Sequence, residues 1–184
     1  MTNYREKLTH LWEFRISDIY ETGQIATERA LQSVLFRELD GNGKDPLCWI
    51  EPTMWVQTSD QPHPTIKPDI VITEDYEIKC IIELKYFPNK QVRLGHDLKK
   101  LKELFGNPKM NGYLLRINPM TGVYNKDKRY KIVPDTLFVM ACIASKEWWE
   151  VNQPDEAEII TESKINNFLL LKASIKRNDF DFQM

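Results

Sequence analysis

Two acids and a lysine stand in the segment KPDIVITEDYEIKCIIELKYF, residues 67–87, where a β-hairpin would bring them together. Apolar runs flank the acidic stretch 74–77, a pattern typical of two strands joined by a turn. Strand side chains alternate between faces, so Glu83 and Lys85 share one face with Ile81. A charged pair therefore interrupts an otherwise apolar strand.

The apolar residues of the two strands set the register of this hairpin. The predicted pairs are Ile70 with Ile82, Ile72 with Cys80, and Thr73 with Lys79. This register places Asp69 opposite Glu83, and directly opposed Cβ atoms lie about 4.5–5.5 Å apart. Two carboxylates at that separation repel each other, and a half-buried carboxylate without a partner is costly. We therefore expect a cation there, and a hard divalent metal meets the requirement.

A third acid, Glu28, falls within the apolar stripe of a helix predicted over residues 25–39. The other members of the stripe are Ile25, Leu31, Leu35 and Leu39. Glu28 is three residues from both Ile25 and Leu31, so its side chain points toward the core face. If this helix packs across the sheet near the hairpin, Glu28 becomes a third oxygen donor, directly or through water. The alternative is a surface acid or one paired with a basic neighbour.

The elements that position these residues are predicted in the order helices first, strands second. Helical patterns cover about 2–20, 25–39 and 94–105, and strand patterns cover 48–56, 69–73, 79–87, 113–117, 136–144 and 168–175. The apolar run of the last segment is equally compatible with a helix. The fold class is therefore α/β (α+β mixed), a central mixed β-sheet flanked by helices. At 184 residues the chain forms a single domain.

Composition indicates a folded globular protein, because hydrophobic residues make up 42% and charged residues 28% of the chain. The net charge of -2 gives no overall positive field, so phosphate binding would need local basic clusters. Cys48, Cys80 and Cys142 form no CxxC motif and indicate neither a disulfide framework nor a zinc site. The first residues lack a signal-peptide pattern and no apolar run approaches a membrane span, so we expect a cytoplasmic protein without a membrane partner.

The hairpin motif resembles that of the PD-(D/E)xK nucleases, which have the restriction-endonuclease-like fold. The match is Pro68-Asp69, a spacer of thirteen residues, and Glu83-Leu84-Lys85. Family members carry the acids and the lysine on a β-hairpin in a mixed sheet flanked by helices, and often add a glutamate from the preceding helix, as Glu28 would. The resemblance covers about residues 24–105. It implies one nuclease-like domain over 1–184, comprising an N-terminal helix (1–23), a catalytic core (24–145) and a C-terminal elaboration (146–184).

The resemblance implies a Mg²⁺-dependent endonuclease that hydrolyses phosphodiester bonds of nucleic acid, with DNA as the expected substrate and Mn²⁺ able to replace Mg²⁺. Asp69, Glu83, the backbone carbonyl of Leu84 and Glu28 would bind the metal. Lys85 would orient the attacking water or stabilise the pentacoordinate phosphate. A homodimer is expected, because many enzymes that cut both strands act as symmetric dimers.

Two basic clusters are candidates for contact with the phosphate backbone. Arg93 and Lys100 lie on the helix predicted after the hairpin, and Lys126, Lys128 and Arg129 lie in a later charged run. A solvated helix face and a charged loop between strands are the commoner interpretations of such clusters.

Other functions are compatible with the same residues. Lys85 would bridge Asp69 and Glu83 as a structural ion pair on a solvated sheet face. The chain would then be a catalytically inactive nuclease-fold binding module. Alternatively it would be an assembly protein whose exposed aromatic residues mark a partner surface, the candidates being Trp49, Trp55, Trp148 and Trp149.

Overall fold

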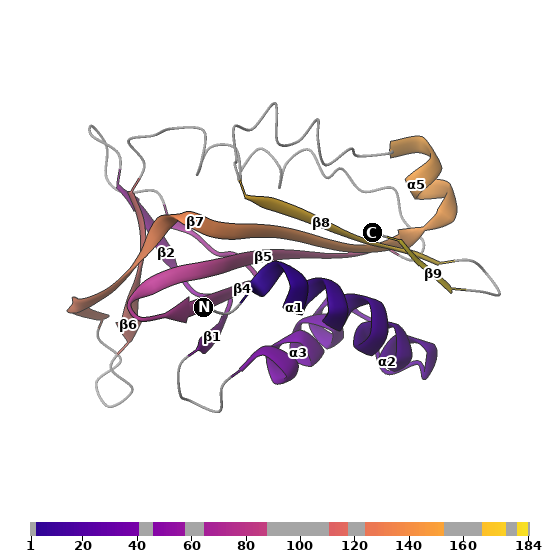
Figure 1. Ribbon diagram of the computed structural model, residues 1–184, viewed down its shortest axis with the longest axis horizontal. Helices are drawn as coiled ribbons and strands as arrows, with labels where there is room; N and C mark the ends of the chain where they lie inside the picture. The colour runs from indigo at the N-terminus through magenta and orange to yellow at the C-terminus, as the bar shows by residue number, and fades with distance from the viewer. Residues whose placement is uncertain are drawn as a thin grey trace.

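The computed structural model describes residues 3–40, 46–57, 65–87, 111–117, 124–152, 167–175 and 180–183. The strands among these residues are β1 (Leu47–Ile50), β2 (Met54–Gln57), β3 (Thr65–Ile66), β4 (Ile70–Glu74), β5 (Glu77–Phe87), β6 (Asn111–Ile117), β7 (Tyr124–Ser145), β8 (Phe168–Ile175) and β9 (Phe180–Gln183). They form one sheet in the order β1-β4-β5-β7-β6-β2-β3, and β8 pairs with both β7 and β9 (Figure 1). The pairs β1–β4 and β4–β5 are antiparallel, whereas β5–β7 and β7–β8 are parallel. The predicted mixed sheet is confirmed.

Strand β7 is long and pairs with different strands along its length. Its first part pairs antiparallel with β6, and its second part runs between β5 and β8 (Figure 1). The predicted strand 136–144 is therefore only the second part of β7. The charged run 126–131 was expected to be a loop, and this expectation is wrong, because the run lies within β7 and its residues 129–131 pair with β6.

A continuous helical segment opens the fold, as predicted for residues 2–20. It consists of α1 (Tyr4–His10), the π-helical η1 (Leu11–Ile16) and α2 (Ser17–Glu21). The next helix, α3 (Glu28–Leu39), begins three residues later than predicted. Its N-cap is Thr27, whose hydroxyl accepts a hydrogen bond from the Ala30 N–H at 3.1 Å. Glu28 is thus the first residue of α3, and Ile25 of the predicted stripe lies before the helix.

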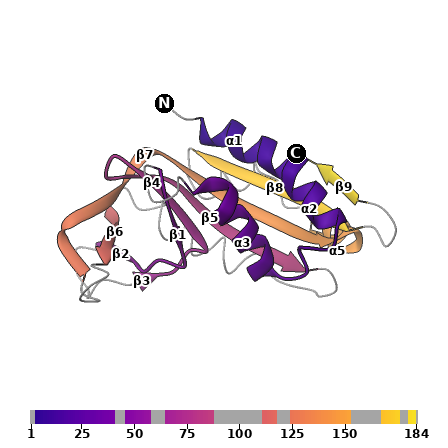
Figure 2. The same cartoon turned by 90° about the horizontal axis from the view of Figure 1, so that it is seen from below.

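The helices α1, η1, α2 and α3 cover one face of the sheet (Figures 1 and 2). Their apolar residues form a first core with residues such as Ile82 and Leu84 of β5. The opposite face carries a second core, which includes Ile81 and residues from α5 (Lys146–Asn152) at one end of the sheet. The sheet therefore separates two apolar layers. No helix among the described residues has the length and apolar character that a membrane crossing needs.

Three further segments have a predicted secondary structure. The predicted strand 48–56 is divided into β1 and β2, because Glu51 has a positive φ of 44° and is followed by Pro52. Residues 168–175, compatible with either strand or helix, form β8. The helix predicted over 94–105 lies outside the described residues.

The hairpin between β4 and β5 is closed by a tight turn. Asp75 and Tyr76 both have positive φ angles, 52° and 63°, as a type I′ turn requires. This turn usually takes Asn-Gly, and the tyrosine is explained by its packing, since its ring stacks on that of Tyr130 with centroids 5.7 Å apart. The turn lies at the opposite end of the hairpin from Asp69.

Candidate functional site

The register of the β4–β5 hairpin is the predicted one at the end that carries the acids. Ile70 pairs with Ile82 and Ile72 with Cys80, as expected. The third predicted pair is wrong, because Thr73 faces Ile78. Lys79 is the extra residue of a β-bulge at this point and forms an ion pair with Glu77. The bulge lies between the site and the turn, so it leaves the register at Asp69 unchanged.

The carboxylate of Asp69 is held directly beside the second acid. Asp69 immediately precedes β4, and its Oδ2 accepts a hydrogen bond from the Leu84 N–H at 2.6 Å. This bond places the carboxylate at the peptide that joins Glu83 to Leu84. In a strand the N–H and C=O of one residue point to the same neighbour, so the Leu84 carbonyl faces the same side. The Asp69 carboxylate and the Leu84 carbonyl therefore lie on the same side of β5, just before β4 begins and next to Glu83 in sequence.

Glu83 and Lys85 lie on the sheet face opposite the helices, together with Ile81, as strand alternation predicts. The Glu83 side chain is buried, with 8% of the residue exposed, whereas Asp69 and Lys85 are half-buried. Burial of an ionised carboxylate is costly unless a cation or hydrogen bonds compensate it. The burial of Glu83 therefore favours a site in which a cation or hydrogen bonds compensate the charge of its carboxylate.

The backbone of Asp69 is fixed from two other segments. Its carbonyl oxygen accepts hydrogen bonds from Nε2 of Gln32 and from the N–H of Glu51, each at 2.9 Å. Glu51 directly follows β1 and falls opposite Asp69 in the β1–β4 register, so this hydrogen bond continues the antiparallel ladder. Sequence reasoning missed both residues. Gln32 left a signal, a long polar side chain directly after Leu31 on the core side of the helix, whereas the role of Glu51 depends on the pairing of β1 with β4, which has no local signature.

Glu28 lies on the same side of α3 as Gln32, one turn earlier, since residues four apart are neighbours on a helix. Helix α3 contacts β5 and β1, which confirms that it packs near the hairpin. Because α3 covers the other sheet face, a site shared with Glu83 would require Glu28 to reach past the part of β5 that extends beyond β4. Glu28 as a metal ligand remains a prediction.

An electrostatic relation links Glu28 to Lys85. Burial raises the pKa of the Cys142 thiol to about 12, while the Lys85 ammonium lowers this pKa and the Glu28 carboxylate raises it. Cys142 is the residue of β7 that pairs with Lys85. The Glu28 carboxylate of α3 and the Lys85 ammonium of β5 therefore both act on the pKa of the Cys142 thiol, although they come from different elements.

The donors present suit a hard cation. Within the described ranges, no three Asp, Glu, His or Cys side chains are gathered closely enough to hold a metal ion by themselves. Asp69 and Glu83 supply two carboxylates, and the Leu84 carbonyl supplies a third oxygen from the backbone. Mg²⁺ usually takes one or two protein carboxylates and completes its shell with water and phosphate oxygens. A set of two carboxylates and one carbonyl fits that ion.

No protein-family model and no curated protein matches this chain. The functional assignment therefore depends on the residues and their geometry.

The structure describes only some of the residues predicted to contact nucleic acid. Arg93 and Lys100 lie outside the described residues. Lys126 and Lys128 lie in β7, and their side chains are outside the described part. Arg129 is exposed on the half of β7 that pairs with β6, away from Lys85. Its contact with nucleic acid stays a prediction.

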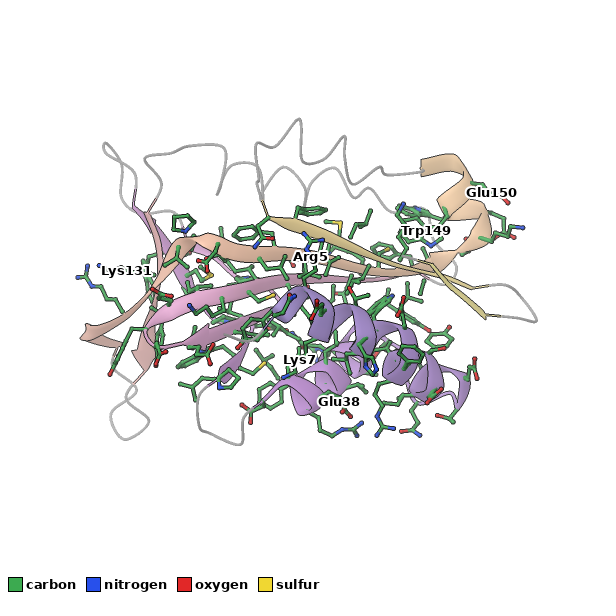
Figure 3. The ribbon with its side chains drawn as sticks, in the orientation of Figure 1. Arg5, Lys7, Glu38, Lys131, Trp149 and Glu150 are labelled. Carbon is green, nitrogen blue, oxygen red and sulfur yellow. The ribbon has the colours of Figure 1, made fainter. Side chains whose placement is uncertain are left out.

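The tryptophans considered as a partner surface are packed within the protein. Trp148 is buried, and Trp49, Trp55 and Trp149 are half-buried, so the expectation of exposed tryptophans is wrong. Trp149, labelled in Figure 3, donates its indole N–H to the Ala173 carbonyl at 2.9 Å. Trp148 and Trp149 lie in α5, whereas Trp49 and Trp55 lie in β1 and β2, and none of the four supports an assembly surface.

The buried thiol beside Lys85 leads to a prediction on pH dependence. The pKa of Cys142 is raised above its ordinary value of 9.0 to about 12, so the folded state keeps the thiol protonated after the unfolded chain has ionised. Its contribution to stability is complete below pH 9.0 and is lost as the pH rises toward about 12. Each pH unit in this interval costs about 1.4 kcal/mol per thiol. In metal-free denaturant titrations between pH 9.5 and 11.5, we expect Cys142→Ala to reduce the alkaline slope by about this amount. Equal slopes would contradict the prediction.

Proposed function

We propose that this protein is a metal-dependent nuclease of the PD-(D/E)xK type with a restriction-endonuclease-like core, which hydrolyses phosphodiester bonds of DNA. The observation that carries this proposal is the hydrogen bond of 2.6 Å between the Leu84 N–H and Asp69 Oδ2. It joins the Pro-Asp half of the motif to the Glu-Leu-Lys half at the open end of a hairpin. A cytoplasmic homodimer belongs to the same proposal.

The metal ligands in this proposal are Asp69, Glu83 and the Leu84 carbonyl, with Mg²⁺ as the ion. Glu28 is proposed as a further ligand, directly or through water. Asp69 uses Oδ2 for the Leu84 N–H, so its Oδ1 is the oxygen that faces a ligand. When bound, Mg²⁺ supplies Lewis acidity that offsets negative charge on the phosphate oxygens.

Lys85 is the residue that distinguishes a catalytic site from one that only binds a metal ion. Its ammonium shares the sheet face of Glu83, two residues further along β5. From this position it donates hydrogen bonds to the attacking water or to a phosphate oxygen. Because the side chain is half-buried, its interaction with developing charge is stronger than it would be in bulk water.

The test is cleavage of labelled single-stranded, double-stranded and branched DNA, and of RNA, with Mg²⁺, Mn²⁺ or EDTA. Asp69→Asn is the diagnostic variant, because asparagine keeps an acceptor for the Leu84 N–H and removes the negative charge. The electrostatic contribution of a catalytic metal is several kcal/mol, and each 1.4 kcal/mol is tenfold in rate. We therefore expect Asp69→Asn to lower DNA cleavage by about 10²-fold or more.

The matched control is Asp75→Asn, the same chemical change in the exposed turn at the other end of the hairpin. It should cleave like the wild type. Cleavage that persists in EDTA, or that is equal in wild type and Asp69→Asn, would contradict the proposal. A folded wild type that neither cleaves any substrate nor gains thermal stability with Mg²⁺ would favour the inactive binding module.

A further inference from the structure

One buried amide connects helix α3 to the candidate site. Gln32 is 7% exposed and belongs to the few buried polar residues in the described part of the chain. Its Nε2 donates to the carbonyl oxygen of Asp69 across 37 positions of sequence. A leucine would extend the apolar stripe of α3 without the cost of desolvating an amide. The bond to Asp69 compensates that cost at this one point.

We propose that Gln32 is a positioning residue, which sets the metal affinity of the site by fixing Asp69 and Glu28 relative to each other. This inference rests on the proposed function. As a positioning residue, Gln32 touches neither the metal nor the substrate. It acts through the backbone of Asp69 and through the helix that it shares with Glu28.

The bonds around Asp69 explain why a positioning residue is effective here. A carbonyl oxygen has two lone pairs, and those of Asp69 accept from Gln32 and Glu51. The carboxylate of the same residue accepts from Leu84. Asp69 is therefore held by α3, by the end of β1 and by β5 at once. Removal of the Gln32 amide releases the hydrogen bond that joins Asp69 to the helix that carries Glu28.

The position of Glu28 depends on the same contact. Glu28 begins α3 four residues before Gln32, so the two side chains project from adjacent turns on one face. The Gln32 bond fixes how closely this face approaches the end of β4. Outer contacts that orient metal ligands typically change metal affinity by about 10–100-fold when removed. Loss of the Gln32 amide should have an effect of that size.

The experiment compares metal affinity in Gln32→Met with that of the wild type. Methionine keeps the length and packing of the side chain and removes the N–H donor, while the Glu51 N–H still satisfies the Asp69 carbonyl. Mn²⁺ binding is measured by electron paramagnetic resonance, and Mg²⁺ binding by isothermal titration calorimetry. We expect the Kd for both ions to rise by about tenfold or more, while the melting temperature stays within a few degrees of the wild type.

The matched control is Thr136→Val, which also deletes a buried side-chain hydrogen bond. Thr136 is 1% exposed, and its hydroxyl donates to the Ile78 carbonyl at 2.6 Å, near the turn end of the hairpin. This variant should lose stability and keep the wild-type Kd. If the wild type and Thr136→Val bind metal and Gln32→Met binds equally well, the inference on Gln32 is overturned and the proposed function stands. If the folded wild type binds neither ion, both are overturned.

Discussion

Replacement of Lys85 by methionine is expected to lower Mg²⁺-dependent DNA cleavage by about 10²–10³-fold, the usual loss when one donor to a charged transition state is removed. Methionine keeps most of the aliphatic stem of this half-buried side chain, so packing is largely preserved. Because Lys85 is not a metal ligand in the proposed site, the Kd for Mg²⁺ should change by less than about threefold, well below the effect of losing a ligand or its support. Single-turnover cleavage and calorimetric titration measure the two quantities.

The contrast with Asp69→Asn makes this prediction specific. That variant should lose metal binding and cleavage together, whereas Lys85→Met should lose cleavage alone. Lys131→Met is the matched control, since Lys131 is exposed and lies at the opposite end of the sheet (Figure 3). Wild-type rates in Lys85→Met would identify Lys85 as a structural ion-pair partner. Loss of folding in this variant would likewise assign the residue to stability.

Truncation of Trp12 to alanine is expected to destabilise the protein by about 3–5 kcal/mol, the usual cost of removing a buried aromatic side chain. Trp12 is 2% exposed and lies in the π-helical segment η1. Its indole N–H donates to the Lys172 carbonyl at 3.1 Å, so the residue ties the helical layer to β8. Domains of this size are stable by about 5–15 kcal/mol, so the loss is a large share of the total. Urea unfolding followed by circular dichroism measures it.

Two variants separate the contributions of Trp12. Trp12→Phe keeps an aromatic ring and removes the indole donor, and we expect a loss of about 1–3 kcal/mol from the carbonyl left without this bond. Phe14→Ala is the control within the same π-helical segment, because Phe14 is 59% exposed and should be close to neutral. A Trp12→Ala protein as stable as Phe14→Ala would show that η1 does not anchor the helical layer.

The hairpin that carries the acids was predictable because its information is local. Pairing Ile70 and Ile72 with Ile82 and Cys80 sets the register at this end of the hairpin, and Asp69 then falls beside Glu83. Strand alternation likewise placed Glu83 and Lys85 on the face of Ile81. These inferences need neighbours in sequence and the period of a strand, both of which can be read directly.

The remaining contacts of the site depend on partners far along the chain. Gln32 and Glu51 converge on Asp69 only after α3 has packed on the sheet and β1 has paired with β4. The charged run 126–131 belongs to a strand in part because its residues 129–131 pair with β6. The bulge at Lys79 also escaped prediction, since a register shift leaves the apolar pattern on both sides intact.

The parallel pairing of β5 with β7 has a consequence for how the protein is made. Every proposed metal ligand lies between residues 28 and 84, so a growing chain contains all of them before β7 has been made. Strand β5 nevertheless obtains its second neighbour only when β7 has been added, because Ile82 pairs with Val139. Until then its apolar edge is open to pairing with other chains. Closing such a long loop is also slow compared with forming the local hairpin. The first half of the chain therefore carries the proposed metal ligands, and the second half supplies the strand that covers the β5 edge.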